Sequence, residues 1–175
     1  TTGAGETEPT GFVTALAGTA SEIPATAGEA FGAADVYALQ NALPARFQPK
    51  AQWCAALPTI NDIAQFETTN GARLFPEVAT GQLLLRPLNE CSNMASTDDV
   101  NGGETADNLI LCYGDWSGFV IADRIGTTIE IIPQVFGTNQ RPTGQRGAFM
   151  WFRTGSKVVV PQAFRILNVA TTAIS

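Results

Sequence analysis

The second half of the sequence most constrains the fold, because its apolar residues follow strand periodicity almost without interruption. Runs rich in β-branched and aromatic residues, separated by turn residues, are typical of strands. They predict strands over residues 109–113, 119–123, 128–132, 149–153, 157–160 and 164–169, with a turn over 114–118. No helical pattern separates these strands. The chain therefore lacks the strand-helix alternation of a doubly wound parallel sheet, and a nucleotide-binding α/β fold is disfavoured.

The first half adds two short helices. A helix is predicted to begin at the N-cap residue Asp35 and to carry apolar residues at one-face spacing: Val36, Leu39 and Leu43. A buried strand over 51–57, which contains Trp53, precedes a second helix that starts at Thr59 and Asp62 and buries Ile60, Ile63 and Phe66. Residues 83–88, interrupted by Pro87, predict an edge or bulged strand. The first thirty-odd residues have no sustained period and predict a long loop. The predicted class is α+β.

Composition excludes several classes of function. The sequence has no histidine, which removes Ser-His-Asp and Cys-His nucleophiles and the commonest metal ligand. Ten basic and sixteen acidic residues give a net charge of −6 without a basic run, so the chain is a poor candidate for binding a phosphate backbone. Charged residues make up only 15% of the chain, against a usual share of about 25%. A surface with so few charges tolerates large protein interfaces.

The sequence predicts neither a metal nor a cofactor. Cys54, Cys91 and Cys112 lie far apart without a C-x-x-C motif, so they are interpreted as buried, reduced thiols. The glycines near residue 3 lack the remainder of a dinucleotide fingerprint. The acidic stretch over 98–107 lacks the register of a calcium loop and is interpreted as a solvated loop. No apolar stretch approaches the ~18 residues that span a bilayer, so no membrane association is expected.

Short motifs follow one another in order along nearly the whole chain. They are Gly5-x-x-Glu8-Pro9-Thr10-Gly11-Phe12, Leu43-Pro44-x-x-Phe47, Ala51-x-Trp53, Gly71-x-x-Leu74-Phe75-Pro76, Gly81-x-Leu83-Leu84-Leu85-x-Pro87-Leu88, Tyr113-Gly114-Asp115-Trp116-Ser117, Ile121-Ala122-Asp123-Arg124 and Pro161-x-Ala163-Phe164-Arg165-Ile166-Leu167. Their order and spacing resemble the tailed-phage major capsid proteins of the Hong Kong 97 type.

The resemblance implies an α+β Hong Kong 97-type capsid fold made of the axial domain and part of the peripheral domain. The N-terminal arm, extended loop and spine helix of the family lie upstream of the segment with which this chain opens, so they are expected to be absent from it. The implied division is a loop region leaving the peripheral domain over 1–34, the axial domain over 35–139, a peripheral return segment over 140–157 and terminal strands returning to the axial domain over 158–175.

The function implied by the resemblance is that of a structural subunit of an icosahedral phage capsid, which forms pentamers and hexamers around double-stranded DNA. The implied location is the virion, with assembly in the host cytoplasm. The implied partners are other copies of the chain and a portal, scaffold or maturation protease, while DNA is enclosed without sequence-specific binding. An encapsulin-type nanocompartment shell protein is the alternative. A carboxylate-based hydrolase using Asp115 and Asp123 is a remote one.

Some family members join subunits by a Lys-Asn isopeptide bond that a Glu assists. Here Met150-Trp151-Phe152 stands where that Glu is expected. This departure argues against self-crosslinking, so no catalytic residue is carried over and the chain is predicted not to be an enzyme.

Charged residues supply the candidate intersubunit contacts. Eight of the ten basic residues are arginines, which suit buried or intersubunit ion pairs. The candidates are Asp98, Asp99, Glu104, Asp115, Asp123, Arg124, Arg153 and Arg165. For Asp115, Asp123 and Arg124, capping of turns within one subunit is an equal alternative. The resemblance implies that the acidic loop with Asp98, Asp99 and Glu104 lies around the five- and six-fold axes.

Overall fold

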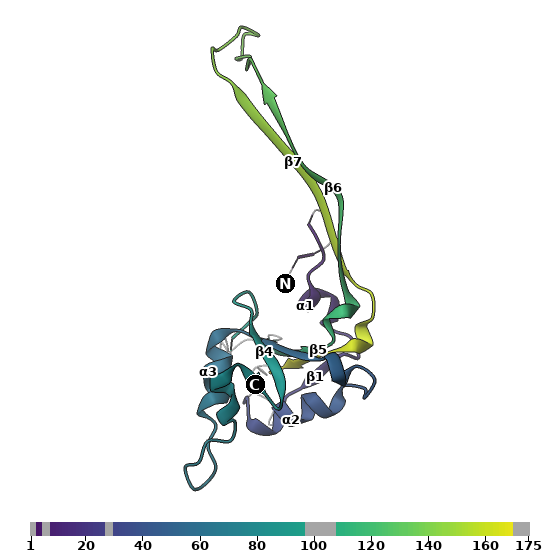
Figure 1. The fold of residues 1–175 in the computed structure, drawn as a ribbon, viewed down its shortest axis with the longest axis vertical. Helices are drawn as coiled ribbons and strands as arrows, with labels where there is room; N and C mark the ends of the chain where they lie inside the picture. Colours follow the sequence, from purple (N-terminus) through teal and green to yellow (C-terminus); the bar gives the residue numbers. More distant parts are fainter. Residues whose placement is uncertain (1–2, 5–7, 27–29, 97–107, 170–175) are drawn as a thin grey trace, which may run out of the picture. The chain divides into compact units, whose positions relative to one another are not determined.

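The computed structural model describes residues 3–4, 8–26, 30–96 and 108–169 (Figure 1). The chain divides into two compact units, a core unit of Thr1–Val120 with Lys157–Ser175 and a hairpin unit of Ile121–Ser156. Helices and strands are combined as the α+β prediction requires. The elements are α1 (Phe12–Leu16), β1 (Glu22–Pro24), α2 (Ala33–Ala42), η1 (Gln48–Lys50), β2 (Gln52–Ala55), α3 (Leu57–Gln65), η2 (Pro76–Thr80), β3 (Gln82–Leu83), β4 (Arg86–Glu90), β5 (Leu109–Gly114), η4 (Trp116–Gly118), β6 (Phe119–Ile132), β7 (Gly147–Val158), η5 (Pro161–Ala163) and β8 (Phe164–Asn168).

The core unit is built on a six-stranded mixed sheet in the order β1-β8-β5-β2-β4-β3. Strand β1 runs parallel to β8, and β2 runs parallel to β4, whereas the other pairs are antiparallel. At the centre, Trp53 lies opposite Tyr113 and Cys54 lies opposite Cys112. Cross-strand partners point to the same face of a sheet. This register therefore places the aromatic pair on one face and the cysteine pair on the other.

The central strands of this sheet, β8, β5 and β2, are mostly buried on both faces. The face with Trp53 and Tyr113 packs against α2 and α3, through Leu39 and Ile63 among others. The opposite face, which carries Cys54 and Cys112, packs against α1 (Figure 1). All six residues of β5 are buried, as expected for a strand covered on both sides. The predictions that Trp53 lies on a central buried strand and that β5 and β8 are strands are confirmed.

Asp35 was predicted to be the N-cap of helix α2, and that prediction was wrong. Helix α2 begins three residues earlier, at Ala33, with Gly32 as its N-cap. The Asp35 carboxylate instead accepts hydrogen bonds from the backbone N–H groups of Gly32 at 2.9 Å and Thr26 at 2.7 Å. These bonds satisfy donors at the helix N-terminus and hold the preceding segment against α2. Asp35 is therefore buried in the first turn of α2, and its carboxylate binds the backbone that precedes the helix.

The prediction of a long N-terminal loop was also wrong, because this part contains α1 and β1. Phe12 and Leu16 lie one helical turn apart and are both buried against the sheet. Strand β1 pairs with β8, the strand most distant from it in the sequence. Neither element has enough apolar residues to show a period by itself. Their structure depends on the sheet that they cover or extend.

Two further boundaries differ from the predictions. Helix α3 starts at Leu57 with Pro58 in its first turn, so β2 ends at Ala55 and Thr59 lies inside the helix. Residues 83–88 form the turn of a hairpin rather than one strand, since Leu84 and Leu85 have φ angles of 48° and 62° between β3 and β4. Strand β4 consequently lies second from the edge and not at it.

Candidate interaction surface on the hairpin unit

The hairpin unit consists of two long antiparallel strands, β6 and β7, of 14 and 12 residues. Eight of the 14 residues in β6 are Val, Ile or Thr, whose branched side chains favour extended backbone. The sequence predicted two short strands in each of these regions, and that prediction was wrong. Gly126 and Gly155, which lie between the predicted short strands, are part of continuous strands.

A tight hydrogen-bonded loop closes the hairpin. The Val135 N–H donates to the Gln145 carbonyl at 3.1 Å, and the Gly137 N–H donates to the Arg141 carbonyl at 3.0 Å. The Thr143 hydroxyl donates to the Val135 carbonyl at 2.7 Å. The loop turns at Gln140, which has a positive φ of 55°. The conformation of this loop is therefore held by hydrogen bonds within residues 135–145.

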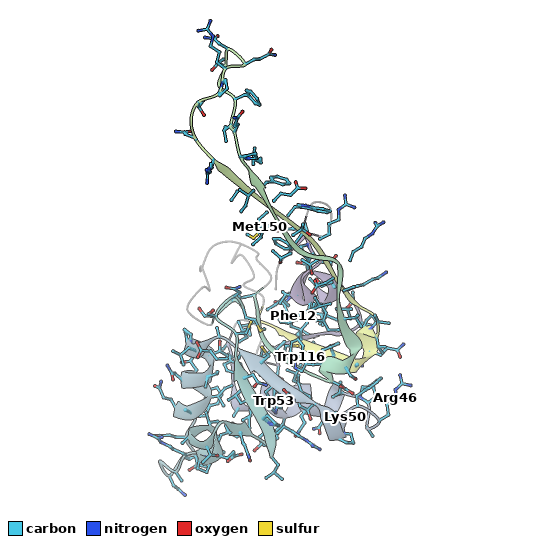
Figure 2. The ribbon with its side chains drawn as sticks, turned by 45° about the horizontal axis from the view of Figure 1, so that its top comes forward. Phe12, Arg46, Lys50, Trp53, Trp116 and Met150 are labelled. Atoms are coloured by element: carbon cyan, nitrogen blue, oxygen red, sulfur yellow. The ribbon has the colours of Figure 1, made fainter. Side chains whose placement is uncertain are left out.

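Apolar side chains lie on both faces of the hairpin. Successive residues of a strand point to opposite faces. Four consecutive residues of β7, Phe149 to Phe152, are each between 40 and 61% exposed, so both faces carry uncovered apolar side chains. On β6, Ile129 and Ile131 share one face and are 65 and 74% exposed. Figure 2 shows side chains, with Met150 labelled, projecting on both sides of the two strands.

We call this set the hairpin apolar surface: Ile129, Ile131, Ile132, Phe149, Met150, Trp151 and Phe152. An antiparallel sheet with one solvated face normally alternates apolar and polar residues. A two-stranded hairpin alone is also marginally stable in water. Exposed apolar side chains gathered in this way are typical of an interaction surface. Both faces of the hairpin carry such side chains.

The two units differ in charge. Residues 121–156 contain four arginines and two carboxylates, a net charge of +2, whereas the other residues of the chain sum to −8. Between Ile131 and Arg153 the sequence has three arginines, Arg141, Arg146 and Arg153, and no acidic residue. All three arginines are exposed. The outer part of the hairpin thus combines apolar side chains with positive charge.

Three predicted contact residues, Asp123, Arg124 and Arg153, lie exposed on the hairpin strands. The predicted contacts Asp98, Asp99 and Glu104 lie outside the described residues. The hairpin position of the first three is compatible with intersubunit contact, which stays a prediction.

The other two predicted residues interact within the chain. The Asp115 carboxylate accepts a hydrogen bond from the Ser117 N–H at 3.0 Å and caps η4, which is the alternative considered for it. The Arg165 guanidinium donates to the carbonyl oxygens of Ala42 at 3.0 Å and Phe164 at 2.7 Å. Partial burial lowers the pKa of Arg165. Arg165 thereby ties β8 to the end of α2, and a contact with a second subunit stays a prediction for both residues.

Within the described ranges, no group of three or more His, Cys, Asp or Glu side chains is arranged to hold a metal ion. Among the helices that the structure describes, none is long and apolar enough to cross a membrane.

Comparison with solved structures defines the class of fold. The chain matches the capsid of a native GTA particle with a TM-score of 0.74 and 20% identity, covering 97% of this chain and 58% of that one. It matches a chain of Mycobacterium phage Ogopogo with a TM-score of 0.58 and 12% identity, covering 93% and 56%. A match to Gordonia phage Cozz has a TM-score of 0.51 and 17% identity, covering 86% and 50%. The core and hairpin units together thus have a phage capsid fold, and the chain spans less than three-fifths of each of these relatives.

Comparison of the amino-acid sequence with family models independently indicates a capsid protein. A sequence model described as the phage capsid family matches residues 1–169. The chain therefore belongs to the phage capsid family, as the resemblance predicted. None of the curated proteins matches the sequence.

Sequence reasoning did not identify the hairpin apolar surface. The signal was present in Phe149-Met150-Trp151-Phe152, because four successive apolar residues on a strand must occupy both of its faces. This run was predicted to form a strand and was used to argue against a catalytic Glu, whereas the candidate contact residues were all charged.

Proposed function

We propose that this chain is part of a structural, non-enzymatic subunit of an icosahedral phage shell. The observation that carries this proposal is the hairpin apolar surface within a phage capsid fold. A subunit of a closed shell is surrounded by other chain segments, so a hairpin with two apolar faces is stable there. The comparisons give no support to the encapsulin or hydrolase alternatives.

Energetics favour burial of this surface in an assembly. Fully burying an Ile, Phe or Met side chain contributes roughly 1.5–3 kcal/mol. Six such residues together with Trp151 supply enough apolar area for the centre of a stable interface. The arginines around them offer bidentate hydrogen bonds to carboxylates of neighbouring subunits. The net charge of −8 outside the hairpin makes those carboxylates available on other copies of the chain.

Finer features of the proposal follow the family resemblance. The axial domain spans residues 35–139 and the peripheral return segment spans residues 140–157, in a subunit that forms pentamers and hexamers. The arm, extended loop and spine helix lie in the part of the relatives that this chain does not span. Double-stranded DNA is enclosed without sequence-specific binding, a portal, scaffold or maturation protease acts on the same shell, and assembly takes place in the host cytoplasm.

The test compares shell yields of the longer gene product with and without the hairpin apolar surface. The variant carries Ile131→Thr and Phe152→Thr, because Thr keeps the preference for extended backbone while removing apolar area. We expect shell yield to fall at least roughly tenfold, since about 1.4 kcal/mol per contact already changes an equilibrium constant by that factor.

The matched control is Leu57→Gln, which removes an apolar side chain that is 49% exposed on α3 in the core unit. Shell yield of this control should stay near that of the unmodified protein. Equal yields for the hairpin variant and the control would show that the hairpin apolar surface has no part in assembly.

A further inference from the structure

All three cysteines lie on one face of the central sheet. Cys54 is the register partner of Cys112 in β5 and of Asn89 in β4. Cys91 follows Asn89 by two residues, and its backbone N–H donates to the Ala55 carbonyl at 2.8 Å, which continues the parallel pairing with β2. Residues two apart on a strand share a face. Cys91 accordingly packs against the same buried cluster as Cys54 and Cys112.

Cys54 and Cys91 are diagonal neighbours across the parallel pairing of β2 with β4, and the neighbouring Cys91 is one cause of the raised pKa of Cys54. Diagonal neighbours in a sheet lie about 7–8 Å apart at Cα, and a disulfide needs ~4.4–6.8 Å. Closure therefore requires a backbone shift of about 1 Å. Cys91 can supply it because it lies just past the end of β4, at the start of a turn in which the Met94 N–H donates to its carbonyl at 3.1 Å.

The two thiols differ in access. Cys91 is partly exposed, while Cys54 is 6% exposed and Cys112 is fully buried. Burial, together with the neighbouring Cys91, raises the pKa of Cys54 to about 12. Burial also raises the pKa of Cys112 well above its usual range. A soluble oxidant therefore meets Cys91 first, and Cys54 can react only with a group that is already beside it.

We propose that Cys54 and Cys91 are a redox-active thiol pair that closes to a disulfide under oxidising conditions and fastens the central strand β2 to the segment that follows β4. Cys112 stays reduced on the other side of Cys54. The pair differs from an isolated cysteine because the register and the shared cluster both place its two side chains next to each other on one face of the sheet.

The chemistry needs an external disulfide such as oxidised glutathione. Cys91 loses its proton and attacks one sulfur atom of that disulfide, whose S–S bond breaks to release one reduced glutathione that takes up the proton. Cys54 then loses its proton and attacks the Cys91 sulfur, and the second glutathione leaves as a thiol. Two electrons pass from the protein to the external disulfide. Two protein thiols become one disulfide, and one glutathione disulfide becomes two thiols.

The disulfide would close a loop over residues 54–91 and restrict the unfolded chain. Such crosslinks typically stabilise the folded state, which corresponds here to a rise of roughly 5–10 °C in the unfolding midpoint. In a particle, the disulfide would form after release from a reducing cytoplasm, where thiols are kept reduced. This last consequence rests on the proposed function. The disulfide itself does not, because it can be tested on the isolated chain.

The experiment treats the purified 175-residue chain with oxidised glutathione, alkylates the remaining thiols and maps disulfides by peptide mass spectrometry. We expect the number of free thiols to fall from three to one and the mapped disulfide to join Cys54 and Cys91. Dithiothreitol should restore the free thiols and abolish the rise in the unfolding midpoint. Closure should accelerate by up to roughly tenfold per pH unit between pH 7 and 9, because the thiolate fraction of Cys54 limits the second step.

Single substitutions distinguish this pair from the other pairings. Cys54→Ser should stop at the glutathione adduct of Cys91, Cys91→Ser should lose no thiol, and Cys112→Ala should still close the disulfide. Thermal unfolding of each variant shows whether the variant is folded. If a variant is not folded, the disulfide mapped by mass spectrometry in the unmodified chain decides between the pairings. A Cys54–Cys112 linkage, a disulfide between two chains, or a persistent glutathione adduct on the unmodified chain would overturn the proposal.

Discussion

Trp53 stacks on Tyr113 across the β2–β5 pair, with ring centroids 4.2 Å apart and an angle of 27° between the ring planes. The two residues are register partners on antiparallel strands, and neither side chain is exposed to solvent. Together they form the centre of the apolar cluster between the sheet and the helices α2 and α3. The stability of the core unit therefore depends strongly on this pair.

Replacing Trp53 by Ala should lower the free energy of unfolding by roughly 3–5 kcal/mol, because a fully buried aromatic side chain and its stacking partner lose their contacts. Denaturation of the 175-residue chain with guanidinium chloride measures this. The matched control is Trp151→Ala on the hairpin, where the side chain is 40% exposed and the cost should stay below about 1 kcal/mol. Similar losses for the two variants would contradict the burial assigned to Trp53.

Tyr113→Phe should leave the chain equally stable or stabilise it by up to about 1 kcal/mol. The Tyr113 hydroxyl is buried and has no hydrogen-bond partner in the described part of the chain. An unpaired buried polar group is unfavourable, and Phe removes it while keeping the ring. A midpoint of chemical unfolding that falls clearly in this variant would show that the hydroxyl is hydrogen-bonded in solution.

Gly114→Ala should destabilise the core unit by about 1–3 kcal/mol, the usual effect of overpacking. A Cβ atom on Gly114 would lie 2.5 Å from the Phe164 ring and 2.6 Å from the Ala163 carbonyl oxygen. Gly155→Ala is the control, because a Cβ there would meet nothing within 4 Å. Thermal unfolding followed by circular dichroism compares the two. A Gly114→Ala protein as stable as the Gly155→Ala protein would be incompatible with the close approach of β5 and β8.

Leu85→Gly should stabilise the isolated chain by about 1 kcal/mol, since a non-glycine residue at positive φ costs of order 1–3 kcal/mol. Leu85 has a φ of 62° and is 86% exposed, so its side chain adds almost no packing within the chain. Chemical denaturation measures the change. Destabilisation by this substitution would mean that the Leu85 side chain has contacts the structure does not show.

Local patterns in the sequence were sufficient to predict the central strands of the sheet. β2, β5 and β8 are short apolar runs that end at turn residues, and continuous runs of this length are typical of buried strands. The sequence could not predict α1 or β1, because their few apolar residues become informative only against the completed sheet. Nor could it predict the left-handed turn at Leu84 and Leu85, which is imposed by the pairing of β3 with β4 on residues that disfavour it.

The candidate surface was only partly accessible to sequence reasoning. Charge identified exposed residues such as Asp123 and Arg153, but it could not show that Arg165 donates its hydrogen bonds inside the chain. The neighbourhood of Cys54, Cys91 and Cys112 was likewise hidden, because strand register cannot be read from positions 37 and 21 residues apart. Long-range pairing determined each of these features.

Electron microscopy of a longer product, the complete subunit to which we propose this chain belongs, tests the central claim most directly. We expect closed shells with icosahedral symmetry, whereas the 175-residue chain alone should stay folded and small, because the hairpin apolar surface lacks the segments that cover it. The same preparation analysed by size-exclusion chromatography shows whether the longer product is assembled before it reaches the grid. A longer product that remains monomeric under all assembly conditions, or closed shells formed by the 175-residue chain alone, would contradict this account.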